Sequence, residues 1–248
     1  FWNIIPSLVL SLELGCYYHY YHLPCLHQIN VKGKKMITIK QAQDIAGTLS
    51  NPSKMPGKGT STPAERCITG SKLRNVEGSV CEGCYAMKGF YVMDNVKPAL
   101  EKRFDGVMGS KDNPEPWINA MVHLIKRQEY FRWHDSGDLQ GSWHLANIVE
   151  VARRTPNVKH WLPTREYRMV TDYTDKITSY EQRLPSNLTI RLSAHKVNGE
   201  PPTELGFPTS TVVTDDSATC PARFQNNECG DCRDCWNSEI ANKSYPKH

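Results

Sequence analysis

Two groups of cysteines at opposite ends of the chain have the residue type and spacing for chemistry. The first group has the spacing C-x13-C-x2-C and the second C-x8-C-x2-C-x2-C. The seven residues are Cys67, Cys81, Cys84, Cys220, Cys229, Cys232 and Cys235. No cysteine occurs in the 135 residues between the two groups. Tight sets of thiols are typical of ligands for an inorganic centre, and we expect an iron–sulfur cluster.

The metal cannot be read from the cysteine spacing alone. Thiolates are soft ligands that favour Zn²⁺ or iron–sulfur clusters. A structural zinc site uses two C-x2-4-C pairs, which the second group could supply by itself. A [4Fe–4S] cluster also binds closely spaced cysteines. Disulfides would leave one of the nine cysteines unpaired. Zinc alone, and redox or disulfide cysteines, therefore stand as alternatives to iron–sulfur.

Two ligand schemes follow from the seven cysteines. In the first, the three early cysteines hold one cluster with an open iron, and the four later cysteines hold a second centre. In the second, one cluster takes ligands from both groups and ties the ends of the chain together. Closing such a long loop would contribute strongly to stability. The sequence leaves both schemes open.

Composition indicates one ordinary globular domain. The chain has 248 residues, of which 39% are hydrophobic and 23% charged. The net charge of +4 comes without a long basic run, so nucleic-acid binding is not indicated. The apolar patch near the start is far shorter than the ~20 residues that cross a bilayer. We expect a cytoplasmic protein without membrane contact.

Residues 1–35 have the character of translated upstream DNA. The sequence Lys32-Gly33-Lys34-Lys35 back-translates to a purine-rich AAGG stretch just before Met36, as in a bacterial ribosome-binding site. We predict that Met36 is the start and that residues 36–248 form a single domain. A genuine N-terminal extension is the alternative. The cysteines and histidines of residues 1–35 are left out of the predicted site.

Apolar runs at regular spacing predict repeated strand–helix units. Strands are predicted to begin at residues 130, 158, 188 and 211, which are 28, 30 and 23 residues apart. Helical stripes of apolar residues occur within residues 96–107 and 117–125, and after Ser142, which we predict to cap a helix. The turn-rich residues 51–65 predict a loop. The expected fold is a complete or partial (β/α) TIM-like barrel.

Polar residues follow the predicted strands, where barrels of this kind carry their chemistry. They are His134, Asp135, Ser136, Asp138, Thr164, Arg165, Glu166, Ser193 and His195. His134 and Asp135 could form an acid–base pair or support a cluster sulfur. Arg165 could bind a carboxylate or phosphate of a ligand. Each of these side chains could equally be a polar loop residue whose hydrogen bonds are satisfied and which has no part in catalysis or binding. We take His134, Asp135 and Arg165 as the candidate catalytic residues.

The segment Cys81-x2-Cys84-Tyr85-Ala86 resembles the CxxCYA signature of a phage-encoded, cysteine-rich family, the gene product 88-like proteins. The segments at 134–138 and 229–236 fit that family too, so the likeness covers most of residues 48–237. The chain is also loosely similar to radical S-adenosylmethionine (SAM) proteins. These place three cysteines in an early loop of a (β/α) barrel and bind a [4Fe–4S] cluster. Their usual spacing is C-x3-C-x2-C, whereas this chain has C-x13-C-x2-C.

The resemblances imply a phage-encoded [4Fe–4S] protein in the cytosol of the host cell, with redox or radical-SAM-like chemistry. The implied partners are a small-molecule substrate or a redox partner, neither identified, with SAM as a candidate ligand. Two alternatives belong to other classes of protein. One is an electron carrier or cluster sensor without enzymatic activity. The other is a zinc-stapled module that binds nucleic acid.

Overall fold

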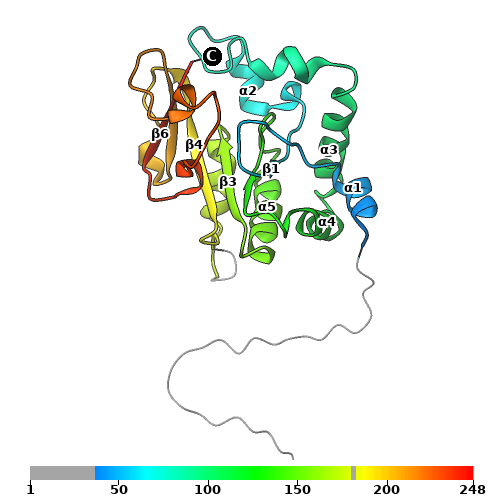
Figure 1. Cartoon of the computed structure of the whole chain (residues 1–248). Helices are drawn as coiled ribbons and strands as arrows, with labels where there is room; N and C mark the ends of the chain where they lie inside the picture. The colour runs from blue at the N-terminus through cyan, green and yellow to red at the C-terminus, as the bar shows by residue number, and fades with distance from the viewer. Residues whose placement is uncertain (1–36, 180–182, 248) are drawn as a thin grey trace, which may run out of the picture. The chain divides into compact units, whose positions relative to one another are not determined.

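A computed structural model describes residues 37–179 and 183–247, and Figure 1 shows their arrangement. The predicted upstream segment, residues 1–35, lies outside the described residues. The α-helices are α1 (Ile39–Ala46), α2 (Ile68–Leu73), α3 (Lys97–Gly109), α4 (Glu115–Ile125), α5 (Ser142–Arg154) and α6 (Tyr167–Thr174). The strands are β1 (Lys58–Gly59), β2 (Tyr130–Arg132), β3 (Lys159–Thr164), β4 (Leu188–Val197), β5 (Thr209–Val213) and β6 (Asn242–Pro246). No helix in these described ranges has both the length and the apolar character needed to cross a bilayer.

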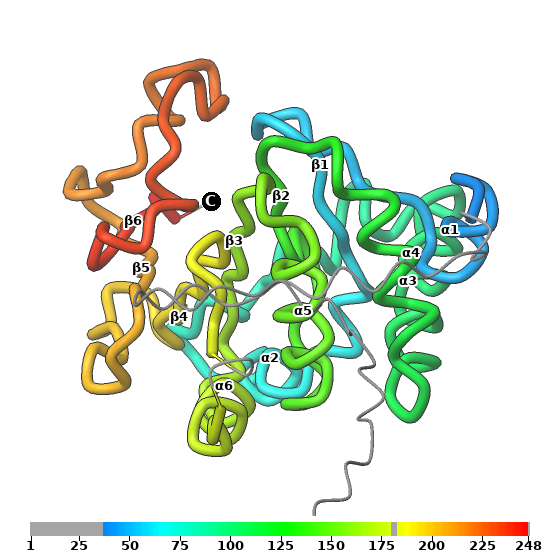
Figure 2. Tube along the Cα trace, turned by 90° about the horizontal axis from the view of Figure 1, so that it is seen from below, coloured from blue at the N-terminus to red at the C-terminus, as the bar shows by residue number. Residues whose placement is uncertain are grey.

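The six strands form one parallel sheet in the order β1-β2-β3-β4-β5-β6. Each strand pairs with the next along the chain, so β1 and β6 are the edges of an open sheet. The predicted parallel sheet of strand–helix units is confirmed, and of the two predicted forms the structure has the partial barrel. Figure 2 shows β5 and β6 at one end of this half-barrel, with α1, α3 and α4 toward the other.

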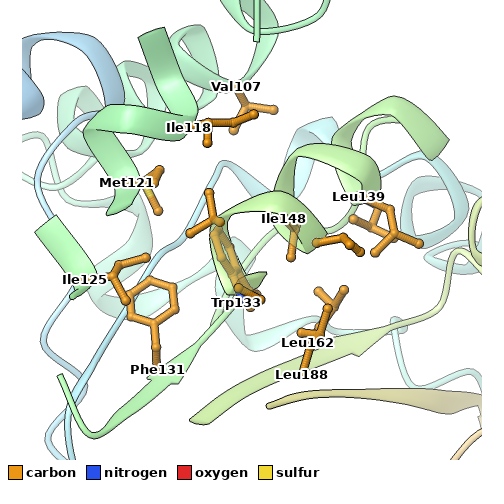
Figure 3. Packing of buried hydrophobic residues seen from close by; sticks show 14 of the residues in the cluster. Val107, Ile118, Met121, Ile125, Phe131, Trp133, Leu139, Ile148, Leu162 and Leu188 are labelled. Carbon is orange, nitrogen blue, oxygen red and sulfur yellow. The ribbon is translucent and has the colours of Figure 1, made fainter. Parts of the chain in front are cut away.

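One face of the sheet carries the main hydrophobic core. Successive residues of a strand point to opposite faces, so Phe131 and Trp133 both face the helices. They pack with Met121 and Ile125 of α4 and with Ile148 of α5, as Figure 3 shows. All five side chains are at most 1% exposed. Burial of one such side chain stabilises the fold by roughly 1.5–3 kcal/mol.

A buried histidine completes the packing on this face. The indole Nε1 of Trp133 donates to Nδ1 of His160 over 3.2 Å. The other ring nitrogen, Nε2, lies 2.9 Å from Oγ1 of Thr155, whose hydroxyl donates to the carbonyl of Val151. These partners fit a neutral imidazole that accepts at Nδ1 and donates at Nε2. Burial lowers the pKa of His160 from 6.5 to about 3.

The C-terminal segment covers part of the opposite face. It contains two 3₁₀ turns, η6 (Pro221–Phe224) and η7 (Asp234–Trp236). Trp236 packs on Trp161 and Tyr130, with ring centroids 5.3 Å apart in both pairs. Its indole nitrogen donates to the carbonyl of Phe131, and its own carbonyl accepts from Thr189 of β4. The cysteine-rich end of the chain is therefore built into the half-barrel.

Some local predictions were wrong. The N-cap of α5 is Gly141, with no side-chain hydrogen bond, and Ser142 is the first helical residue. The predicted loop at 51–65 contains the edge strand β1. The opposite edge strand, β6, had no strand prediction, because its polar residues Asn242 to Ser244 lack the apolar character of a buried strand.

Candidate functional site

The three early cysteines meet near the start of α2. Cys67 is the N-cap residue of this helix, and Cys81 and Cys84 lie in the loop that follows it. A Cβ added at Gly70 would lie 3.6 Å from the sulfurs of both Cys67 and Cys81. It would also lie 3.0 Å from the Cβ of Cys67. Glycine at position 70 therefore keeps the space beside the two thiols clear of a side chain. We call Cys67, Cys81 and Cys84 the three-cysteine group.

Hydrogen bonds to the end of β4 hold the loop that carries Cys81 and Cys84. The amide of Val80 donates to the carbonyl of His195, and the amide of Val197 donates to that of Gly78. These contacts surround an antiparallel bridge between Ser79 and Lys196. The loop is thereby fastened to a strand that lies more than a hundred residues later in the sequence.

A tyrosine fastens the same loop to the end of β2. The hydroxyl of Tyr85, next to Cys84, donates to the carbonyl of Asp135. Contacts to both β2 and β4 place the three-cysteine group at the carboxyl ends of the parallel strands. In barrels of parallel strands this is the end that carries the chemistry.

Two buried carboxylates support the three-cysteine group. Glu166 accepts hydrogen bonds from the amide and the hydroxyl of Thr69, both at 2.7 Å. Asp138 accepts from the hydroxyl of Thr164 at 2.6 Å and from the amide of Arg165 at 2.9 Å. Burial raises the pKa of Asp138 to about 6. Both carboxylates lie close enough to Cys67 to act electrostatically on its thiol, and both raise its pKa.

The four later cysteines form a second group against β6 and the sheet face covered by Trp236. The amide of Cys220 donates to the carbonyl of Ser244, and the amide of Cys229 donates to that of Lys54, both between 2.8 and 3.0 Å. The amide of Cys232 donates to the carbonyl of Cys229. The sulfur of Cys235 lies 3.1 Å from the hydroxyl of Tyr245 in β6. We call Cys220, Cys229, Cys232 and Cys235 the four-cysteine group.

A fully buried arginine anchors this segment. Arg191 of β4 is 0% exposed, and its guanidinium donates to four backbone carbonyls. The acceptors are Thr209, Ile240, Asp234 and Asn237, at 2.9 to 3.1 Å. Three of these carbonyls belong to the segment that carries Cys235. Arg191 therefore fixes the turn beside the last cysteine from inside the half-barrel.

Burial disfavours free thiolates in both groups. It raises the pKa of Cys67, of Cys81 and of Cys229, and it raises that of Cys235 to about 11. Without a metal these thiols are therefore protonated at neutral pH. A metal centre binds thiolates, so loading would release protons and stabilise the fold.

The donor set fits an iron–sulfur cluster. In residues 37–179 and 183–247, no three His, Cys, Asp or Glu side chains are arranged to hold one metal ion. That finding concerns a single ion, around which sulfurs lie about 2.3 Å from the metal. The thiolates of a cluster bind different irons and lie further apart. The buried Nε of Arg165 has no hydrogen-bond partner in the described structure, although its charge acts on Cys81. Such a donor suits the sulfur of an anionic cluster.

The predicted catalytic residues take separate positions. His134 lies in the core, 4% exposed, with its ring centroid 5.3 Å from that of His144 in α5. Burial lowers the pKa of His134 to about 3. The carboxyl of Asp135 is buried, and its electrostatic neighbours are Arg132 and Arg103. Of the three candidates, only Arg165 lies beside the three-cysteine group.

The backbone conformation explains these orientations. His134 has a φ of 55° and Gly137 a φ of 81°, both in the left-handed region. A Cβ at Gly137 would collide with Oγ1 of Thr62. The chain therefore turns sharply after β2, and Asp138 rather than His134 reaches the cysteines. The position of residues 134–138 directly after a predicted strand identified the whole segment as a candidate site. It could not show which of its side chains points toward the thiols.

Sequence comparison identifies the family. The family model Gene product 88 matches residues 27–238, which include both cysteine groups. No curated protein and no solved structure gives a significant match to the chain. None of the comparisons supports the looser similarity to radical SAM proteins. The chain belongs to the gene product 88 family of phage proteins.

Proposed function

We propose that this phage protein binds iron–sulfur clusters at both cysteine groups and works in one-electron chemistry. The observation that carries the proposal is the meeting of Cys67, Cys81 and Cys84 at the carboxyl ends of the parallel strands. Cys67, Cys81 and Cys84 would hold three irons of a [4Fe–4S] cluster and would leave the fourth iron without a cysteine ligand, available to a substrate. The four-cysteine group has enough thiolates for a second, fully ligated centre.

The side chains around the three-cysteine group have supporting parts in this proposal. Glu166 orients the first turn of α2 through Thr69, two residues after Cys67. Tyr85 holds the loop of Cys84 against β2. Arg165 offers a donor to the cluster. When bound, a [4Fe–4S] cluster supplies one-electron transfer, and the protein sets its potential and orientation.

Anaerobic purification tests the proposal. We expect a brown protein that contains iron and sulfide, with broad absorption at about 400 nm, a general property of iron–sulfur proteins. The Cys81→Ser variant should lose the iron of one centre and Cys229→Ser that of the other. Met108→Ser, at an exposed position of α3 outside both groups, is the control and should keep all of it. Native protein with zinc and neither iron nor sulfide would refute the proposal.

A second experiment separates an enzyme from a carrier. SAM is added to the reduced, iron-loaded protein, and its cleavage products are measured. Cleavage that is lost in Cys81→Ser but kept in Cys229→Ser would assign radical chemistry to the three-cysteine group. Without cleavage, the protein would act as an electron carrier or react with another substrate.

A further inference from the structure

A tyrosine hydroxyl contacts a cysteine sulfur in the four-cysteine group. The hydroxyl oxygen of Tyr245 lies 3.1 Å from Sγ of Cys235, and either atom could be the donor. We infer that Tyr245 donates this hydrogen bond to the Cys235 thiolate of the iron-loaded protein and thereby raises the reduction potential of the four-cysteine centre. The inference rests on the proposed function, since it needs an iron–sulfur centre at this group. Tyr245 is then a positioning residue of that centre and not a ligand.

Metal binding decides which of the two atoms donates. A cysteine thiol can donate or accept a hydrogen bond, and so can a tyrosine hydroxyl. A cysteine that binds a metal is a thiolate, which has no hydrogen to donate. The sulfur of Cys235 can then only accept, and Tyr245 is the donor. Among the residues that the structure describes, the Tyr245 hydroxyl has no other hydrogen-bond partner, so its single hydrogen is available to the sulfur.

Strand β6 holds the hydroxyl beside the sulfur. The two residues before Tyr245 also bond to the cysteine-bearing segment. Nζ of Lys243 donates to the carboxylate of Asp234 at 2.6 Å, and the carbonyl of Ser244 accepts from the amide of Cys220 at 3.0 Å. Lys243 and Ser244 are at most 5% exposed. Three successive residues of β6 therefore contact this segment, so that the strand fixes the position of the Tyr245 hydroxyl.

The hydrogen bond is shielded from water. Cys235 is 8% exposed, whereas the other three cysteines of the group are only partly buried. Cys235 packs with Trp161 and Trp236, and the ring of Tyr245 packs against the same cluster. A hydrogen bond is stronger in such surroundings of low dielectric constant than in water. Cys235 is therefore a ligand on which a single donor has a large effect.

A donor to a ligand sulfur favours reduction of the centre. Reduction adds an electron, and the ligand sulfurs share the added negative charge. A hydrogen bond to one of these sulfurs stabilises that charge, and hydrogen bonds to the sulfurs are among the features that set the potential of a cluster. A hydrogen bond with an ionised partner is roughly twice as strong as one between neutral groups. The Tyr245 hydroxyl should consequently raise the potential.

Replacement of Tyr245 by phenylalanine tests the inference. Tyr245→Phe keeps the ring in its cluster and removes only the hydroxyl. The charges that act on Cys235, among them Arg191 and Arg132, are the same in both proteins. Iron-loaded proteins are titrated anaerobically at pH 8 with dithionite, which transfers one electron without forming or breaking a covalent bond in the protein. Electron paramagnetic resonance follows the reduced centre. We expect the reduction equilibrium constant of the four-cysteine centre to fall about tenfold, or by about 59 mV in potential.

Further variants separate hydrogen bonding from packing. All proteins carry Cys81→Ser, which removes the other centre, so that one signal is followed. Tyr130→Phe is the matched control, because Tyr130 belongs to the same cluster and its hydroxyl bonds to no cysteine of the described chain. Its potential should equal that of the parent protein. 3-Fluorotyrosine at position 245 is a stronger donor and should raise the potential, a shift that a purely structural role would not produce. It also decides the question should Tyr245→Phe fail to fold.

Several results would overturn the inference. The potential could be unchanged in Tyr245→Phe, or 3-fluorotyrosine could leave it unchanged or lower it. Either outcome would leave iron at the four-cysteine group and the proposed function intact. Zinc in place of iron at this group would also overturn the inference, while the three-cysteine centre of the proposed function survived. Absence of iron from both groups would overturn the proposed function itself, so the two failures are distinguishable.

Discussion

At the scale of single residues, small changes beside the cysteines separate metal binding from folding. Gly70 and Ser79 each touch the three-cysteine group without supplying a ligand. Their substitution therefore changes the surroundings of the thiols and leaves the thiols themselves in place. Changes at the buried histidines of the core, by contrast, should affect the stability of the fold rather than metal binding.

Replacement of Gly70 by alanine should reduce iron binding without unfolding the protein. The new Cβ would lie beside the sulfurs of Cys67 and Cys81. Alanine in a helix is favoured over glycine by up to about 1 kcal/mol, which offsets the tight 3.0 Å approach to the Cβ of Cys67, so the thermal stability of the metal-free protein should change little. Iron per chain is the measurement. Gly109→Ala in α3, whose Cβ meets nothing within 4 Å, is the control. Equal iron content in the two variants would contradict the prediction.

The buried histidine His160 should make stability fall in acid. Its pKa is about 3 in the folded chain and 6.5 normally, so the unfolded chain binds more protons between these values. The stabilisation is present above pH 6.5 and is lost as the pH falls toward 3. Between pH 7 and pH 5 the loss is about 2 kcal/mol from this residue.

Urea unfolding at the two pH values measures this loss. His160→Gln cannot take up a proton, so its stability should be lower at pH 7 but should fall less on acidification. The iron content is followed in parallel, because acid also releases metal. If the free energy of unfolding depends on pH in the same way in the wild type and the variant, His160 is not the cause of the loss of stability in acid.

At the scale of elements, the loop between α2 and α3 depends on a few hydrogen bonds to distant strands. Ser79, 2% exposed, accepts hydrogen bonds from the amides of Cys81 and Glu82 and donates to the carbonyl of Leu73. Its neighbours bond to the end of β4. The loop is therefore ordered by tertiary contacts, although short turns make up most of its backbone.

Replacement of Ser79 by alanine should loosen this loop. The buried amide of Cys81 loses its acceptor, which costs about 1–3 kcal/mol when it stays unpaired, whereas the amide of Glu82 keeps its bond to the carbonyl of Ser79. We expect faster amide hydrogen exchange in residues 78–84 and weaker iron retention under a chelator. Ser71→Ala, which removes only a bond to Ile68 within α2, is the matched control. Unchanged exchange in the Ser79 variant would show that the loop is held by other contacts.

At the scale of the whole molecule, the C-terminal segment covers part of one face of the open sheet. The half-barrel exposes one face of β2 to β4, and Trp236 with its neighbours covers part of it. Arg191 ties the same segment to β4, and β6 completes the sheet edge. The four-cysteine group belongs to this segment, so the proposed metal binding there would be coupled to the folding of the sheet.

Replacement of Trp236 by alanine should destabilise the whole domain. Loss of this buried side chain costs about 3–5 kcal/mol, and the carbonyl of Phe131 loses its donor. Urea unfolding gives the free energy, with iron content as a second measurement. Phe224→Ala is the control, since Phe224 is 77% exposed and should change stability little. If Trp236→Ala lowers the free energy of unfolding only slightly, the C-terminal segment contributes little to the stability of the domain.

The sequence by itself determined the local features. The spacing of the cysteines predicted both groups, and the spacing of the strands predicted the parallel sheet. Apolar stripes predicted α3, α4 and α5. Each of these signals comes from residues that lie near one another in the sequence. Tertiary structure alone decided that the cysteines form two groups of three and four and that the half-barrel stays open. It also selected Asp138, Glu166, Arg132 and Arg191 as the charges beside the thiols. These depend on contacts between residues about 30 to 120 positions apart, and no local pattern specifies which side of a strand or loop such residues meet.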